Sequence, residues 1–142
     1  MKAAPVKIRQ GTETDWPHIV ITWLKSFARS DFARYINVSI YRQNHKRLIQ
    51  KFVETSDIIL ACAEDDETFI FGYVIYEFDR TAGVIVHYLH VKPKFRRYGI
   101  GKRLLMLATG QEPYTITHYT KPFKWLKQTN YKYDPYLFLE EK

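Results

Sequence analysis

Three apolar runs separated by short polar connections place the strongest constraint on the fold of this chain. The runs cover residues 57–63, 68–78 and 84–91. The first connection carries Asp65-Asp66-Glu67, and the second carries Arg80-Thr81-Ala82-Gly83. Connections this short join antiparallel strands, because a crossover between parallel strands needs about a dozen residues or more. The sequence therefore predicts an antiparallel meander of three strands in the middle of the chain.

The segments around the meander carry one further strand pattern and three helix patterns. Residues 6–9 alternate as a first strand, and Thr12-Glu13-Thr14-Asp15 supplies capping residues before a helix with Pro17 in its first turn. Two more helices are predicted at residues 39–54 and 100–109, the latter ended by Gly110. The side chains expected to point inward are Trp16, Ile19, Val20, Trp23 and Phe27 on the first helix, Ile40, Tyr41, Leu48, Phe52 and Val53 on the second, and Leu104, Leu105 and Leu107 on the third.

The last part of the chain adds a strand at residues 114–120, a helix opening at Pro122, and extended structure at 131–140. Antiparallel strands mixed with crossover helices indicate an α+β, or mixed α/β, sheet protein. A chain of 142 residues with 46% apolar residues fits one core. We therefore expect a single domain spanning residues 1–142.

Composition narrows the classes of protein. The single cysteine, Cys62, excludes an internal disulfide and a multi-cysteine zinc site, and its apolar neighbours predict a buried side chain. We expect no metal. No run approaches the roughly 20 apolar residues of a membrane span, and residues 1–5 lack the apolar stretch of a secretion signal. These features predict a soluble, cytoplasmic protein without a membrane partner.

The positive charge is concentrated in one stretch. The formal net charge is +7, and six of the 22 basic residues lie between residues 92 and 103 with no acidic residue among them. They are Lys92, Lys94, Arg96, Arg97, Lys102 and Arg103. A solvated surface would explain a dispersed charge, whereas this clustering favours a local site for an anion.

The same stretch has the form of an anion-binding loop. A strand ends and Pro93 turns the chain. Gly99 then precedes the predicted helix, and Gly101 lies in its first turn. Free amide N–H groups and the helix dipole favour phosphate at such a helix start. Glycines there allow close approach of a ligand and unusual dihedral angles. The Walker pattern and the third glycine of the dinucleotide fingerprint are both missing, which leaves a loop of another kind.

The run Arg96-x-x-Gly99-x-Gly101 matches the Gln/Arg-x-x-Gly-x-Gly/Ala motif of the GNAT superfamily of N-acetyltransferases. Residues 89–93 resemble the fourth strand of that family and its turn, and the order of elements is similar over nearly the whole chain. The resemblance implies a central, mostly antiparallel twisted sheet of six to seven strands, flanked by about four helices. It also implies that the sheet is splayed between its fourth and fifth strands.

The resemblance further implies acetyl-CoA as the donor and a primary amine as the acceptor, joined by direct attack. Residues 96–101, followed by Lys102, would hold the pyrophosphate through backbone N–H groups. The strand residues beside them would pair with the pantetheine arm. The implied coenzyme-binding residues are Leu89, His90, Val91, Arg96, Arg97, Tyr98, Gly99, Ile100, Gly101 and Lys102.

Direct attack needs a neutral amine, and histidine is the natural general base near neutral pH. His87 lies on the fourth predicted strand, where some family members carry a histidine, and it is the leading candidate. Strand alternation places His90 on the opposite face, and His118 is a further candidate. Leu126 occupies the position where many members have the tyrosine that protonates the thiolate. Tyr119, near the position where many members have an asparagine, is a candidate general acid in its place, and Tyr131 and Tyr133 are further candidates.

The acceptor remains open between a small amine, a protein amine and an aminated nucleobase. The family resemblance is also compatible with a homodimer. A second hypothesis is a non-catalytic GNAT-like module that binds nucleic acid or protein. The net charge, the basic face of the helix at residues 39–54, and the aromatic content of 16% support this alternative.

Overall fold

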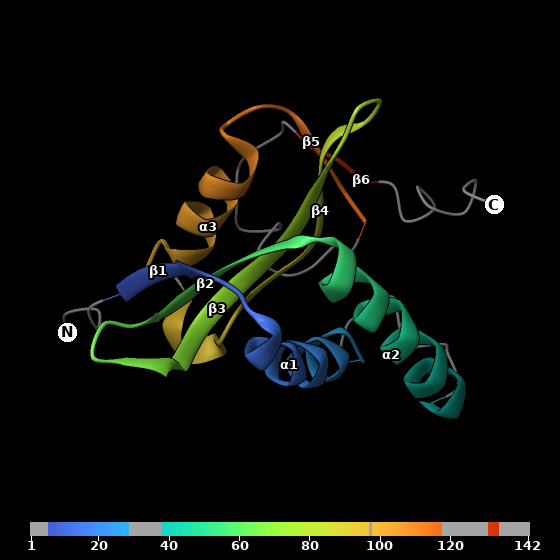
Figure 1. The fold of residues 1–142 in the computed structure, drawn as a ribbon, viewed down its shortest axis with the longest axis horizontal. Helices are drawn as coiled ribbons and strands as arrows, with labels where there is room; N and C mark the ends of the chain where they lie inside the picture. The colour runs from blue at the N-terminus through green and yellow to red at the C-terminus, as the bar shows by residue number, and fades with distance from the viewer. Residues whose placement is uncertain (1–5, 29–37, 97, 118–130, 134–142) are drawn as a thin grey trace.

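The computed structural model describes residues 6–28, 38–96, 98–117 and 131–133 (Figure 1). The strands are β1 (Val6–Gln10), β2 (Asp57–Ala63), β3 (Asp66–Asp79), β4 (Gly83–Val91), β5 (Tyr114–Ile116) and β6 (Tyr131–Tyr133). The α-helices are α1 (Trp16–Ala28), α2 (Val38–Thr55) and α3 (Ile100–Thr109). Two short 3-10 helices, η1 (Glu13–Asp15) and η2 (Pro93–Phe95), precede α1 and follow β4.

The described strands form one six-stranded sheet in the order β1 to β6. The first four strands pair antiparallel, which confirms the predicted meander of β2, β3 and β4. Strands β5 and β6 add to the edge of β4 in parallel. The protein therefore has the mixed α+β fold that the sequence predicted.

Helices cover both faces of the sheet (Figure 1). On one face, α1 and α2 enclose a core that includes Trp23, Ile49 and Tyr88. On the other face, α3 packs against the sheet around Leu89 and Leu104. Each helix buries an apolar stripe against the strands, and this burial is the main favourable contribution to the fold.

Two predicted inward side chains point outward instead. Leu48 is exposed and its neighbour Ile49 is fully buried, because the buried stripe of α2 continues through Phe52 and Val53. Leu107 of α3 is also exposed, since Leu104, Leu105 and Ala108 form the stripe of that helix. The side chains of Phe27, Ile40 and Tyr41, and the helix predicted from Pro122, lie outside the described residues.

Strand β4 contains a β-bulge. Tyr76 pairs with Val86 and the next residue back along β3, Ile75, pairs with Tyr88, so His87 has no counterpart on β3. An extra residue of this kind shifts the side-chain alternation of a strand by one position. The bulge therefore determines which side chains of β4 face α3 and which face α1 and α2, before and after His87.

Strands β4 and β5 run together over a short stretch only. Their pairing covers Val84–Val86 against Tyr114–Ile116 among the described residues. Immediately beyond it, the N–H of Thr117 donates to the carbonyl of Val86 over 3.2 Å. Strand β4 continues to Val91. This short pairing agrees with a sheet that opens between its fourth and fifth strands.

Candidate functional site

The turn between β4 and α3 ends at a glycine that the backbone requires. Gly99 caps the N-terminus of α3 with a left-handed φ of 80°, a conformation that costs a residue with a Cβ about 1–2 kcal/mol. The first intrahelical bond runs from the N–H of Arg103 to the carbonyl of Gly99. The N–H groups of Ile100, Gly101 and Lys102 therefore have no partner within the helix. This helix start presents backbone donors suited to an anion.

Basic side chains around this helix start are not neutralised. Within the described ranges, none of Lys92, Lys94, Arg96, Lys102 and Arg103 forms an ion pair with a carboxylate. The Nε of Arg96 donates to the carbonyl of Val91 over 2.8 Å, which fixes the guanidinium beside the end of β4. Tyr98 is exposed, and Arg97 lies outside the described residues. The predicted anion site thus retains its positive charge.

Gly101, in the first turn of α3, has no side chain to fill the space beside it. Its backbone conformation is one that any residue can adopt. A Cβ built there would meet Val91 Cγ2 at 3.4 Å and Leu89 Cδ2 at 4.0 Å, both ordinary contacts. Leu89 and Val91 point toward α3 and belong to its apolar core. The absence of a side chain at Gly101 is therefore not demanded by the protein's own packing, and fits close approach by a ligand.

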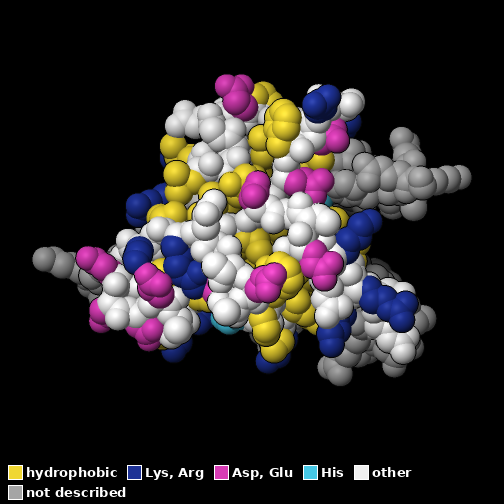
Figure 2. Space-filling view, in the orientation of Figure 1, with side chains coloured by type: hydrophobic (Ala, Val, Ile, Leu, Met, Phe, Trp, Pro, Cys, Tyr) yellow, Lys and Arg dark blue, Asp and Glu magenta, His cyan; other side chains and the backbone are white. Residues whose placement is uncertain are grey.

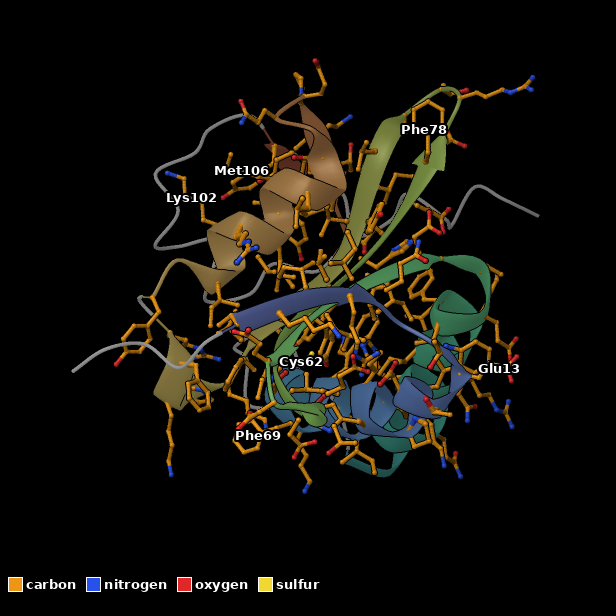
Figure 3. The ribbon with its side chains drawn as sticks, turned by 60° about the vertical axis from the view of Figure 1, so that its left-hand side comes forward. Glu13, Cys62, Phe69, Phe78, Lys102 and Met106 are labelled. Atoms are coloured by element: carbon orange, nitrogen blue, oxygen red, sulfur yellow. The ribbon has the colours of Figure 1, made fainter. Side chains whose placement is uncertain are left out.

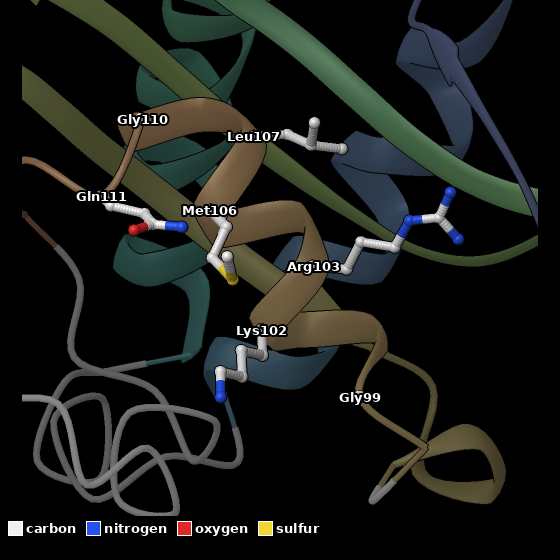
Figure 4. Close-up of a pocket in the computed structure, with 7 residues that line it drawn as sticks. All are labelled: Gly99, Lys102, Arg103, Met106, Leu107, Gly110 and Gln111. Atoms are coloured by element: carbon white, nitrogen blue, oxygen red, sulfur yellow. The ribbon is translucent and has the colours of Figure 1, made fainter.

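A hollow of about 450 Å³ runs along the outer face of α3 (Figure 4). Its lining residues are Gly99, Lys102, Arg103, Met106, Leu107, Gly110 and Gln111. Figure 3 shows Lys102 and Met106 projecting from α3. The hollow runs from the cationic start of α3 along the solvent-facing side of this helix, where Leu107 is also exposed.

His87 lies in a buried polar cluster on the opposite face of the sheet from α3. Its side chain has no exposed surface, and its ring stacks on Phe52 of α2 with a centroid separation of 3.9 Å. The Nε2 atom lies 3.0 Å from Oε2 of Glu77, and Nδ1 lies 3.1 Å from Oγ1 of Thr117. The cluster links β3, β4 and the residue that follows β5.

Burial and Glu77 act on this histidine in opposite directions. Burial is the larger influence and lowers the pKa of His87 below its ordinary value, because an imidazolium is poorly solvated there. The Glu77 carboxylate raises the pKa in part. The ring is consequently neutral at pH 7 and able to accept a proton.

His90 does not lie where strand alternation predicted. Its ring lies 5.3 Å from that of Tyr73, on the α1 and α2 side of the sheet, which is the side that His87 also faces. The prediction of opposite faces is wrong because His87 is itself the extra residue of the bulge, and the side-chain alternation of β4 shifts by one position there. Burial, assisted by nearby cations including Arg96, lowers the pKa of His90 to about 4.

Glu77 is a member of the cluster that sequence reasoning missed. It pairs with Ile85 across the β3–β4 hairpin, two residues before His87. If the register of that hairpin is known, Glu77 lies diagonally across from His87 on the neighbouring strand. This diagonal position is the signal by which the sequence could have identified Glu77 as a partner of the histidine. Diagonal neighbours lie within reach of long side chains.

Of the candidate general acids Tyr119 and Tyr131, Tyr131 is described by the structure and does not lie near His87. Tyr131 of β6 packs on the α3 side, with its ring 5.9 Å from that of Tyr114. The imidazole of His87 lies on the α2 side. Tyr119 and His118 lie outside the described residues.

The fold is similar to that of several solved acetyltransferase structures. The chain is similar to a candidate acetyl transferase from Pyrococcus furiosus, at 22% identity over 72% of this chain and 71% of the other, with a TM-score of 0.57. It is also similar to the GNAT family N-acetyltransferase YhbS from Escherichia coli in complex with CoA, at 22% identity and a TM-score of 0.51. That match covers 75% of this chain but 56% of YhbS.

A third similar structure is the aminoglycoside N-acetyltransferase AAC(6')-Iy in complex with CoA. The identity is 13% over 94% of this chain and 78% of the other, with a TM-score of 0.52. A comparison with curated proteins gives no significant match. These likenesses establish the class of fold, which is that of the GNAT acetyltransferases.

The chain belongs to the acetyltransferase (GNAT) family, whose model matches residues 20–111. The matched region contains the bulged strand β4, the basic turn and the start of α3. Among the residues that the structure describes, no helix is long and apolar enough to cross a membrane. The described part of the chain also holds no cluster of three or more potential metal ligands from His, Cys, Asp and Glu.

Proposed function

We propose that this protein is an N-acetyltransferase that moves the acetyl group of acetyl-CoA to a primary amine by direct attack. One observation carries the proposal: the N-terminus of α3, capped by left-handed Gly99, presents unpartnered amides among cations that no described carboxylate neutralises. Within the GNAT family this is the place expected to hold a pyrophosphate. The proposal includes a cytoplasmic location and one domain over residues 1–142.

The residues present fit the coenzyme. The N–H groups at the start of α3, up to that of Lys102, would hold the pyrophosphate. The N–H of Arg96 already donates to the carbonyl of Pro93 over 3.4 Å, so Arg96 would act through its side chain, which with that of Lys102 would add charge-assisted hydrogen bonds. The backbone of β4 from Leu89 to Val91, where β5 no longer pairs with it among the described residues, would receive the pantetheine arm. Bound acetyl-CoA supplies a thioester carbonyl that is open to a nucleophile.

His87 is the proposed general base. In the reaction, the amine nitrogen bonds to the carbonyl carbon, the C–S bond breaks, and the amine gives up one proton. The buried imidazole has no surface for direct contact with an acceptor. Thr117, whose hydroxyl lies 3.1 Å from Nδ1, would pass the proton to it.

Tyr119 and Tyr131 are the proposed donors of the proton that the thiolate takes. The placement of Tyr131 on the α3 side of the sheet separates it from the base. Such a separation suits an acid that serves the leaving group while His87 serves the amine. The acceptor class stays open between small amines, protein amines and aminated nucleobases.

Calorimetric titration with acetyl-CoA tests the donor assignment. We expect wild type to bind and Gly99→Glu to lose binding, because the new carboxylate would lie at the anion site. Gly83→Glu is the matched control: Gly83 also has a positive φ, 78°, and open space around it, but it lies in the β3–β4 turn. Absence of wild-type binding at high micromolar ligand would refute the proposed function.

The alternative is a non-catalytic module that binds nucleic acid or protein. The charge of +7 favours it. Acidic and basic side chains are interspersed over the face shown in Figure 2, however, instead of forming one basic surface. DNA binding that persists under saturating acetyl-CoA, without acetyl transfer to any amine, would favour the module over the enzyme.

A further inference from the structure

Glu77 connects the buried imidazole of His87 to the protein surface. Its Oε2 lies 3.0 Å from His87 Nε2 and also accepts a hydrogen bond from the Ser56 hydroxyl over 3.2 Å. The Glu77 side chain is 24% exposed, whereas that of His87 is 0% exposed. A half-buried carboxylate thus binds the inner histidine on one side and reaches solvent on the other.

The carboxylate determines which nitrogen of His87 is basic. An ionised carboxylate only accepts hydrogen bonds, so Nε2 must carry the proton that lies between it and Glu77. In the neutral ring, Nδ1 then keeps its lone pair and can accept from the Thr117 hydroxyl at 3.1 Å, in place of the longer 3.4 Å hydrogen bond from that hydroxyl to the carbonyl of His87. Thr117 directly follows the last paired residue of β5, so the basic nitrogen faces the point where β4 and β5 separate.

We propose that Glu77 is the positioning residue of the site, which holds His87 with Nδ1 directed at Thr117 and compensates the charge of the imidazolium formed during transfer. The proposal rests on the proposed function, in which His87 is the base. Stacking on Phe52 fixes the plane of the ring, but an aromatic hydrocarbon cannot select a tautomer. That selection falls to the hydrogen bond with Glu77.

The proton transfer balances along this route. The amine N–H bond breaks and its proton bonds to Oγ1 of Thr117, while the hydroxyl proton of Thr117 bonds to Nδ1 of His87. The net change is one proton moved from the amine to the imidazole. The resulting imidazolium pairs with the Glu77 carboxylate, which relieves the cost of a buried charge. After the product leaves, the proton returns to water by the same route.

The groups around His87 make Glu77 the source of this effect. Strand β3 contributes the Glu77 carboxylate, α2 contributes Phe52, and the residue after β5 contributes Thr117. Neither Phe52 nor Thr117 ionises near neutral pH. Among the described residues, Glu77 is therefore the charged group whose removal should change both the tautomer and the basicity of His87.

Long-range ¹H–¹⁵N NMR of the histidine rings tests the coupling without any need for activity. We expect wild type to show the Nε2–H tautomer of His87, and Glu77→Gln to lose that single tautomer and to titrate at a lower pH. Glu77→Asp keeps the charge on a shorter side chain and should recover part of the shift. Glu54→Gln is the control, since it removes an exposed carboxylate from α2.

Release of CoA from acetyl-CoA, measured with a thiol reagent, tests the role in transfer. The acceptors are kanamycin, phenethylamine and a lysine-containing peptide. For any acceptor that wild type acetylates, Glu77→Gln should lower kcat by about tenfold or more, with the KM for acetyl-CoA unchanged. Glu54→Gln should leave both constants unchanged.

The outcomes separate the two proposals. An unchanged tautomer and titration of His87 in Glu77→Gln would overturn the positioning role, as would a changed tautomer with an unchanged kcat. A wild-type protein that neither binds acetyl-CoA nor acetylates any of the three amines would overturn the proposed function. In that case the NMR result would still report whether Glu77 and His87 are coupled, so the two failures are distinguishable.

Discussion

The two faces of β4 contribute to the site in different ways. Toward α3, the strand presents Val86, Leu89 and Val91 in apolar packing beside the helix start, where the first N–H groups have no partner within the helix. Toward α2, it presents His87 in a polar cluster with Glu77 and Thr117. In the proposed function, coenzyme binding on the α3 side (the donor side) would therefore rely on backbone groups and glycines, whereas acetyl transfer on the α2 side (the chemical side) would rely on particular side chains. Substitutions should separate binding from turnover.

The largest expected effect is on turnover. His87→Gln should lower acetyl transfer by about 100-fold or more, because a glutamine can keep the hydrogen bonds of the cluster but cannot take a proton. It should also remove the limb of the pH–rate profile in which the rate falls as pH falls through the lowered pKa of His87. Acetyl-CoA affinity, measured by calorimetry, should stay within about twofold. A comparable loss of affinity would contradict the division between the faces.

The next effect is on stability, at the ion pair that anchors η1, the 3-10 helix leading into α1, to β1. Arg9 and Asp15 form a two-pronged ion pair with both N···O distances at 2.8 Å, and Asp15 also accepts from the N–H of Thr12. Asp15→Asn should lower the free energy of unfolding by about 2 kcal/mol. The measurement is urea unfolding, and acetyl-CoA affinity under native conditions should be unchanged.

The pH dependence of this anchor has a defined sign. The Arg9 hydrogen bonds hold the pKa of Asp15 below its ordinary value, so the folded state favours the ionised carboxylate. The stabilisation is fully present at pH 7 and is lost as pH falls below about 4, through the lowered pKa. The difference between wild type and Asp15→Asn should therefore shrink in acid. A difference that grows in acid would refute the assignment.

Gly101→Ala should separate binding from stability on the donor side. The new methyl group meets Val91 at 3.4 Å, so the fold accommodates it, and alanine raises helix propensity by up to about 1 kcal/mol. We expect equal or higher thermal stability together with a roughly tenfold weaker affinity for acetyl-CoA, since that methyl would occupy the space left for the ligand. Unchanged affinity would show that the ligand does not approach this residue.

The smallest expected effect comes from Lys102, an exposed cation at the start of α3 (Figure 3). Lys102→Gln should weaken acetyl-CoA binding by about two- to fivefold at low salt, and the difference should fade as salt screens the charge. Lys51→Gln, on the exposed side of α2, is the control and should have no effect. Equal effects of both variants would mean that general charge attracts the ligand.

The donor side was predictable because its signals are local. The bounds of β2 and α3 match the sequence prediction, as does the glycine cap at Gly110, since apolar periodicity and glycine positions decide them within a few residues. Gly99 and the surrounding cations also lie within one short stretch, from which the sequence predicts an anion site. The outward placement of Leu107 was missed because Leu104, Leu105 and Leu107 are all apolar. In a helix of only ten residues, this pattern does not decide whether Leu107 or Ala108 continues the buried stripe.

The chemical side was only partly predictable because its signals are distant in sequence. Strand pattern selected His87, but its partners come from residues 10 and 30 positions away. No glycine or proline lies next to the bulge in β4 to mark it, and simple alternation therefore placed His90 on the wrong face. Finding Glu77 requires the exact pairing of Glu77 with Ile85 across the β3–β4 hairpin, which strand ranges predicted at 68–78 and 84–91 do not specify.

The bulge at His87 also divides β4 into two half-strands of opposite parity. Even-numbered Val84 and Val86 face α3 before the bulge, and odd-numbered Leu89 and Val91 face it afterward. A one-residue deletion within the bulge would restore uniform parity and turn one half inside out, whereas paired changes within either half leave the other unaffected. The half that borders the β3–β4 turn holds β5 and places Glu77 opposite Ile85, while the half beside the start of α3 holds Leu89 and Val91 in a separate frame.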